Sequence, residues 1–119
     1  MKILLLYDDE LSVEMMETLL ELNGCHVTTC VEPKLAVELI KSNHYDLILT
    51  DFMMPGMNGI AFVEAIKDYR DNSKVAFTTA YMKDLFDNSD KESKVDRIFM
   101  KPINVDELLE YVNSLKITS

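Results

Sequence analysis

The feature that most constrains the fold of this chain is its pair of unbroken apolar runs. In "KILLLY" (2–7) every residue after Lys2 is apolar or aromatic, and in "DLILT" (46–50) the apolar run is Leu47 to Leu49. A strand with one side facing water alternates apolar and polar residues, so unbroken runs predict strands that are covered on both faces. Strands of this kind are typical of a parallel sheet with helices on either side.

Three further runs predict three more strands, at 25–30, 74–79 and 97–100. Helical patterns lie between the five runs. Strands that alternate with helices predict an α/β, doubly wound (βα)5 fold with an open sheet. A chain of 119 residues leaves little room for a second core, so we expect one domain over 1–119.

End signals mark four of the five expected helices. The first is predicted over 10–22, and the second begins at Pro33, which suits a first helical position. Asn58 can cap the third helix, and Asn104 with Glu107 has the spacing of a capping box at the start of the fifth. The apolar stripes that should face the core include Leu35, Leu39 and Ile40 in the second helix and Phe62, Val63, Ile66 and Tyr69 in the third.

The segment 84–95 is the weak helix of the five. Leu85 and Phe86 are its only apolar residues before Val95. Because a helix with so thin an apolar stripe has little surface to bury, we expect it to be short, shifted or mobile.

The charge of the chain excludes some partners. Twenty-one acidic residues against twelve basic ones give a net charge of −9. This charge argues against direct binding to nucleic acid or to an anionic membrane surface. No run approaches the roughly 18 apolar residues of a membrane span, and the N-terminus does not resemble a signal peptide, so we expect a cytoplasmic location.

The two cysteines are predicted to be structural. Cys25 and Cys30 do not have the spacing of a zinc site. Five positions apart in one strand, they would lie on opposite faces, so we expect two reduced, buried thiols rather than a disulfide.

Polar residues collect where the predicted strands end. Ligands of an open parallel sheet bind beyond the carboxyl ends of the strands. The residues delivered there are Asp8 and Asp9 after the first run, Asp51 after the third, Thr78 and Thr79 in the fourth, and Lys101 after the fifth.

A cluster of Asp8, Asp9 and Asp51 would favour a bound cation. Two carboxylates about 4 Å apart repel by roughly 4 kcal/mol at an effective dielectric constant near 20. Oxygen ligands select a hard ion, so we expect Mg²⁺, with Mn²⁺ possible. Lys101 adds a positive charge suited to phosphate, and Thr79 adds a hydroxyl donor. Together with a carboxylate nucleophile, these groups indicate phosphoryl transfer onto an aspartate.

In its motifs the chain resembles the receiver domain of two-component response regulators, over essentially its whole length. The matching motifs are "DDE" after the first strand, "LILTDFMMPGMNG", "TTA" after the fourth strand and "KP" after the fifth. The resemblance implies a flavodoxin-like, five-stranded parallel sheet in the order 2-1-3-4-5.

The resemblance also implies roles for single residues. Asp51 would be the phosphoryl acceptor. Asp9, Asp51 and the main-chain carbonyl of Met53 would bind Mg²⁺, and Asp8 would act through metal-bound water. These positions match the family motif in this sequence.

Two further residues would serve the transferred group. Lys101 would pair with Asp51 at rest and with the phosphoryl group afterwards, and Thr79 would hydrogen-bond a phosphoryl oxygen. The resemblance implies a cis bond between Lys101 and Pro102. The donor would be the phosphohistidine of a sensor histidine kinase or phosphotransferase, or a small molecule such as acetyl phosphate.

The sequence departs from the family at three positions. Ile98 stands where an aromatic residue is usual, and Phe99 should face the opposite side of the sheet. Met53 and Tyr81 occupy the positions that often tune hydrolysis, and neither readily orients an attacking water. We therefore expect a comparatively persistent acyl phosphate.

Output is expected through a partner protein. The face made by 84–95, 97–100 and the fifth helix would bind a downstream target, and the chain could stand alone or be part of a longer protein. One alternative is a receiver-fold adaptor that is not phosphorylated. A less favoured one is an aspartate-nucleophile phosphatase, in which Met53 would occupy the place of a second acid.

Overall fold

The computed structural model describes residues 1–54, 56–70, 72–80 and 95–118. The predicted helix over 84–95 therefore lies outside the described residues except for Val95, and so does Tyr81.

Five parallel strands form one sheet in the order β2-β1-β3-β6-β7, which confirms the predicted order 2-1-3-4-5. The strands are β1 (Lys2–Leu6), β2 (His26–Cys30), β3 (Leu47–Asp51), β6 (Lys74–Thr79) and β7 (Arg97–Met100). The order reverses between β1 and β3, so the carboxyl ends of these strands face a topological switch point.

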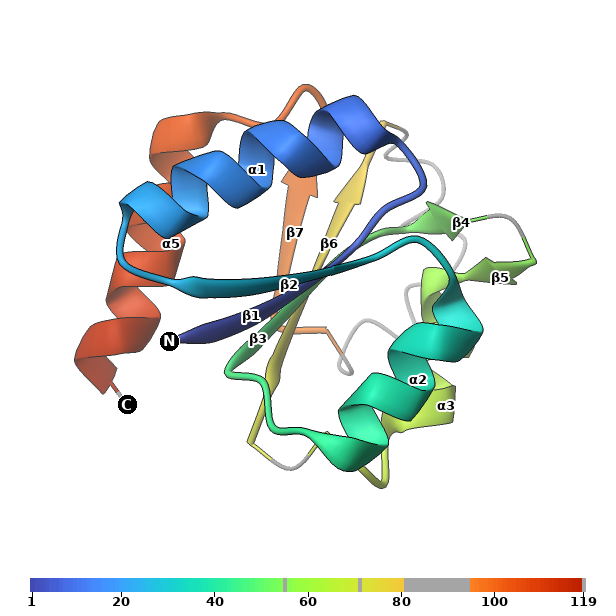
Figure 1. The fold of residues 1–119 in the computed structure, drawn as a ribbon. Helices are drawn as coiled ribbons and strands as arrows, with labels where there is room; N and C mark the ends of the chain where they lie inside the picture. The colour runs from blue at the N-terminus through green and yellow to red at the C-terminus, as the bar shows by residue number, and fades with distance from the viewer. Residues whose placement is uncertain (55, 71, 81–94, 119) are drawn as a thin grey trace.

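Helices cover both faces of the sheet (Figure 1). The described helices are α1 (Glu10–Leu22), α2 (Pro33–Ser42), α3 (Gly59–Ile66) and α5 (Val105–Thr118). α1 and α5 lie on one face, whereas α2 and α3 lie on the other (Figure 1). None of the helices in the described part of the chain is long and apolar enough to cross a membrane.

The two faces carry two separate cores, and β1 contributes to both. Ile3 and Leu5 pack in the cluster under α1 and α5, while Leu4 and Leu6 pack in the cluster under α2 and α3. All four side chains are fully buried. This alternation explains why the strand is apolar without interruption.

The cysteines follow the same alternation. Cys25 belongs to the core under α1 and α5, and Cys30 to the core under α2 and α3. Both are buried free thiols, as predicted.

The expected helix caps are present. The Asn58 side chain accepts a hydrogen bond from the backbone N–H of Ala61 at 2.9 Å, and the Asn104 side chain accepts one from that of Glu107 at 3.0 Å. A capping box also requires the Glu107 side chain to accept a hydrogen bond from the backbone N–H of Asn104. This part of the prediction was wrong, because the Glu107 carboxylate pairs with Arg97 at 2.9 Å.

Two residues of the predicted apolar stripes do not face the core. The Leu35 side chain is 51% exposed, since α2 turns Ala36 and Ile40 inward instead. Tyr69 is 45% exposed because α3 ends at Ile66, before the position that would have returned it to the sheet.

A short hairpin that the sequence did not predict as strands follows β3. β4 (Met53–Met54) and β5 (Met57–Asn58) pair antiparallel. Gly56 in the turn has a φ of 83°, a conformation that favours glycine. The hairpin brings the chain back so that α3 starts close to the end of β3.

Gly59 allows α3 to pack closely against the sheet. Its backbone N–H donates to the carbonyl of Phe52 at 2.6 Å. A Cβ atom at this position would lie 2.8 Å from the ring of Phe77. The close approach of helix and sheet therefore depends on the missing side chain.

Candidate functional site

A pocket of about 500 Å³ lies at the carboxyl ends of the strands. Its polar lining consists of Tyr7, Asp9, Ser12, Asp51, Thr78 and Lys101. These residues come from four regions that are far apart in the sequence, and the parallel sheet brings them to one edge.

The centre of the pocket is an ion pair between Asp51 and Lys101. Lys101 Nζ lies 2.6 Å from Asp51 Oδ2. Asp51 ends β3 and its side chain is only 15% exposed, whereas that of Lys101 is 41% exposed. A carboxylate that is held on a rigid strand and keeps a cation within reach is suited to receive a charged group.

The backbone around this pair is fixed on both sides. The N–H of Lys101 donates to the carbonyl of Thr79 at 2.8 Å, and the N–H of Phe52 donates to that of Thr78 at 2.9 Å. The bond between Lys101 and Pro102 is cis, which confirms the prediction.

Asp9 lines the same pocket from the start of α1. As the N-cap of this helix, it accepts hydrogen bonds from the Ser12 hydroxyl at 2.7 Å and from the N–H of Leu11 at 3.2 Å. These bonds, that of the Ser12 side chain first, hold the pKa of Asp9 below its ordinary value. The carboxylate therefore stays ionised at neutral pH.

The predicted cluster of three carboxylates is not found in the described part of the chain. There, no three acidic, histidine or cysteine side chains are arranged to hold a metal ion. Asp8 is exposed and is not among the lining residues of the pocket, whereas Asp9 and Asp51 are. Since Mg²⁺ binds through one or two carboxylates and keeps several waters, these two residues still fit the ion.

Of the two threonines at the end of β6, Thr78 and not Thr79 is among the described residues that line the pocket. Both are about 2% exposed. Thr78 is the residue that pairs with Asp51 in the sheet register. The sequence favoured Thr79 as the phosphoryl-sensing hydroxyl, and that role stays a prediction.

Tyr7 is a site residue that the sequence reasoning missed. Its hydroxyl lies 2.9 Å from Thr78 Oγ1, and both residues line the pocket. Burial raises the pKa of Tyr7 well above its usual value, and the charge of Asp51 adds to this effect. The available signal was a single hydroxyl-bearing residue at the end of an aliphatic run, just before the acids.

The sequence matches the family described as response regulator receiver domain over residues 3–113. The chain belongs to this family. Proteins of the family bind Mg²⁺ at their phosphorylation site and interact with histidine kinases and downstream effectors.

Two curated relatives support the assignment of this receiver domain. It is 36% identical over 118 residues to a cyclic di-GMP phosphodiesterase of Thermotoga maritima, covering 99% of this chain and 30% of that protein. It is 35% identical over 115 residues to the CpxR homolog of Haemophilus influenzae, covering 94% and 49%. The receiver domain thus spans less than half of each of these relatives.

Solved structures agree with the fold. The receiver domain of the Francisella response regulator 1452 has a TM-score of 0.85 and 31% identity, with 99% of this chain and 98% of that chain covered. Response regulator TrrA of Thermotoga maritima, solved in complex with Mg(2+)-BeF, has a TM-score of 0.84 and 27% identity, with 96% and 97% covered.

This receiver domain has Ile98 at the position where an aromatic residue is usual in the family. Ile98 packs against the core under α2 and α3, whereas Phe99 is buried in the core under α5. The ring of Phe99 meets that of Tyr111 edge-on at 5.8 Å, and the Arg97 guanidinium lies 5.0 Å from its centre. Phe99 is thus held on the opposite face from Ile98.

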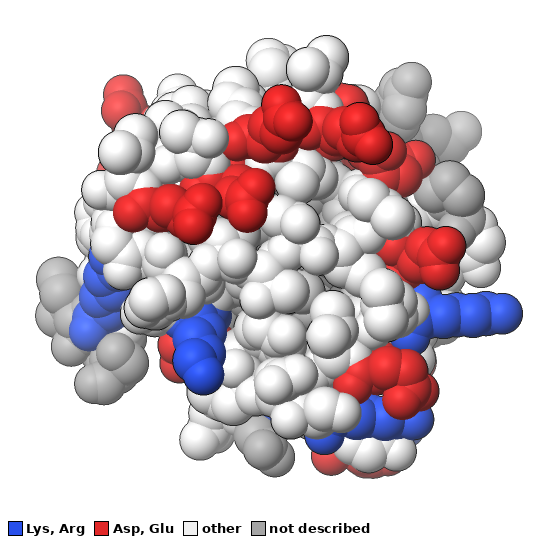
Figure 2. Space-filling view, viewed as in Figure 1, with Lys and Arg blue, Asp and Glu red and all other residues white. Residues whose placement is uncertain are grey.

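The surface beside the pocket is strongly acidic. Acidic side chains gather over α1 in Figure 2, and this helix carries Glu10, Glu14, Glu17 and Glu21 without a basic residue. A negative field of this kind raises the local concentration of cations near the pocket.

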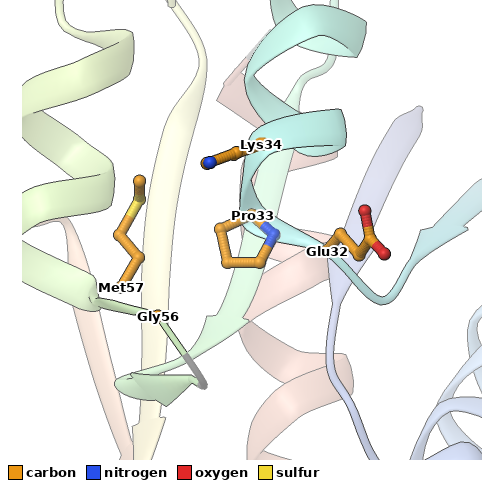
Figure 3. Close-up of a pocket in the computed structure, with 5 residues that line it drawn as sticks. All are labelled: Glu32, Pro33, Lys34, Gly56 and Met57. Carbon is orange, nitrogen blue, oxygen red and sulfur yellow. The ribbon is translucent and has the colours of Figure 1, made fainter.

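A smaller pocket, of about 280 Å³, lies between the start of α2 and the hairpin. In Figure 3, Met57 faces Pro33 and Lys34 across the gap, and the carboxylate of Glu32 points away. No carboxylate among the residues that line this pocket is directed into it, whereas the larger pocket is lined by Asp9 and Asp51.

Proposed function

We propose that this receiver domain accepts a phosphoryl group on Asp51 in a Mg²⁺-dependent reaction and thereby changes its binding to a partner protein. The observation that carries the proposal is the 2.6 Å pair of Asp51 and Lys101, in a pocket that also contains the carboxylate of Asp9. A sensor histidine kinase or phosphotransferase would be the physiological donor.

The side chains divide the work of the transfer. An oxygen of Asp51 attacks the phosphorus, and the bond from phosphorus to the donor, an imidazole nitrogen or an acetate oxygen, breaks with its electrons leaving on the donor. Lys101 moves from the carboxylate to an oxygen of the phosphoryl group, because the charge at that position rises from −1 to about −2. Thr79 is proposed as the hydroxyl that senses the loaded state.

Asp9 and Asp51 would hold the metal, together with the main-chain carbonyl of Met53, and Asp8 would act through water. Bound Mg²⁺ would neutralise charge on the transferring group. The fixed N-cap bonds of Asp9 keep this carboxylate ionised and oriented before the ion arrives.

The output surface is proposed to include β7 and α5. Arg97 ties the two elements together, since it pairs with Glu107 and lies over the ring of Tyr111 at 5.3 Å. The segment 84–94, which would complete this face, lies outside the described residues.

The proposal is tested with acetyl phosphate and Mg²⁺, followed by intact-protein mass spectrometry. The wild type should gain one phosphoryl group, and Asp51→Asn should gain none. Asp68→Asn, which removes an exposed carboxylate after α3, is the matched control and should be labelled like the wild type. Chelation of Mg²⁺ should abolish labelling. A folded wild type that takes up no phosphoryl group would instead support the unphosphorylated adaptor.

A further inference from the structure

Tyr7, Asp51 and Thr78 form one row across three strands. Thr78 of β6 pairs with Asp51 of β3, and Leu6 of β1 pairs with Thr50, so Tyr7 continues β1 to the level of Asp51. The side chains of alternate residues face the same side of a sheet. The Tyr7 hydroxyl reaches Thr78 Oγ1 at 2.9 Å. Since β3 lies between the strands of Tyr7 and Thr78, this bond passes over β3 at the phosphoryl acceptor.

The two hydroxyls have more protons than their mutual bond uses. Each hydroxyl supplies one donor, and one of the two donors makes the bond between Tyr7 and Thr78. The other remains, in a pair of side chains that are both about 2% exposed. A buried donor without an acceptor is costly, so the second proton needs an oxygen nearby.

Asp51 is the carboxylate that lines the same pocket and pairs with Thr78 in the sheet register. Lys101 occupies Asp51 Oδ2, and a carboxylate can accept about four hydrogen bonds, so acceptor sites remain on this group. Thr78 stands on the strand next to Asp51, whereas Tyr7 approaches from the other side of β3.

We propose that Tyr7 is a positioning residue: its hydroxyl donates to Thr78 Oγ1, so that the Thr78 hydroxyl donates to an oxygen carried by Asp51. In the loaded state this oxygen belongs to the phosphoryl group. The inference rests on the proposed function, because it requires Asp51 to be the acceptor. It adds a contact to the site that does not involve Thr79.

Beryllium fluoride with Mg²⁺ is the probe, because it occupies the acceptor carboxylate without a covalent step. Binding is measured by ¹⁹F NMR and by titration of backbone amide resonances. Tyr7→Phe and Thr78→Val should each weaken the binding of beryllium fluoride by about tenfold, the effect of one hydrogen bond to a charged group. Thr78→Ser, which keeps the hydroxyl, should bind like the wild type.

Two further readouts separate positioning from a structural role. The affinity for Mg²⁺ alone should change by less than about twofold, since neither hydroxyl is a proposed ligand. The double variant Tyr7→Phe/Thr78→Val should bind no more weakly than Thr78→Val, because Tyr7 acts through Thr78. Tyr45→Phe is the matched control: Tyr45 is also a buried tyrosine, but it precedes β3 at the opposite edge of the sheet.

The outcomes also separate this inference from the function on which it rests. If the wild type binds beryllium fluoride through Asp51, but Tyr7→Phe and Thr78→Val bind as tightly as Tyr45→Phe, the positioning role is refuted and the acceptor role stands. If Asp51→Asn binds the probe as well as the wild type does, both proposals fail. Should Tyr7→Phe not fold, the comparison of Thr78→Val with Thr78→Ser decides.

Discussion

Replacing Gly59 by alanine tests how closely α3 must pack against the sheet. A Cβ atom at this position would lie 2.8 and 2.9 Å from two ring atoms of Phe77 and 3.0 Å from the ring of Phe52. The two rings are buried and meet edge-on at 5.4 Å, so neither can move aside freely. Helix and sheet must therefore separate, or a ring must leave its preferred rotamer.

The size of the effect follows from two opposing terms. Forcing an extra methyl group into a packed core costs about 1–3 kcal/mol. Alanine is favoured over glycine inside a helix by up to about 1 kcal/mol, and less in the first turn. We therefore expect Gly59→Ala to lower the free energy of unfolding by about 1–2 kcal/mol, with a fall in Tm of about 4 °C per kcal/mol.

Urea unfolding followed by circular dichroism measures this change. The same substitution in a Phe77→Leu background provides the control, because the shorter side chain removes the ring edge that the Cβ atom meets. In that background Gly59→Ala should cost at least about 1 kcal/mol less. A Gly59→Ala variant as stable as the wild type, or an equal cost in both backgrounds, would refute the steric argument.

Two further predictions concern pH and the lifetime of the loaded state. The backbone N–H of Lys2 donates to Asp46 at 2.7 Å, and this bond is the main reason that the pKa of Asp46 lies below its ordinary value of 3.8. Its stabilisation is complete above that value and is lost as the pH falls through the lowered folded-state pKa. At pH 7 the free energy of unfolding of Asp46→Asn should therefore be lower than that of the wild type by less than about 1 kcal/mol, and the difference should shrink as the pH falls below 3.8. A difference in urea unfolding that widens on acidification would contradict this. Met53 is 57% exposed on β4, and the variant Met53→Asn offers an amide that can orient water. The phosphorylated Met53→Asn variant should therefore lose its phosphoryl group faster, as followed by ³¹P NMR, than the wild type or Met53→Leu. Equal lifetimes would count against the role of Met53.

The fold was largely predictable because its signals are local. Unbroken apolar runs identified the strands that are buried on both faces, and Pro33 and Asn58 marked where helices begin. Errors arose where a side chain had a choice of partner. Glu107 pairs with Arg97 of a neighbouring strand rather than completing its own capping box, and no local pattern could show that competition.

The candidate site was predicted in part. Asp51, Lys101 and Asp9 follow from strand ends and motifs, and the structure places all three around one pocket. Asp8 is exposed and is not among the described residues that line the pocket, and its predicted role through metal-bound water stays a prediction. The direction of a side chain beyond a strand end depends on the following turn, which strand periodicity does not describe.

The sequence by itself determined the five strands of the main sheet and which edge of the sheet collects the charged residues, because both depend on the order of residues along the chain. Only the tertiary structure decided that Tyr7 meets Thr78, 71 positions away, across the strand that carries Asp51. That contact depends on the register of three neighbouring strands, and a shift of one residue in any of them would turn the side chains to opposite faces.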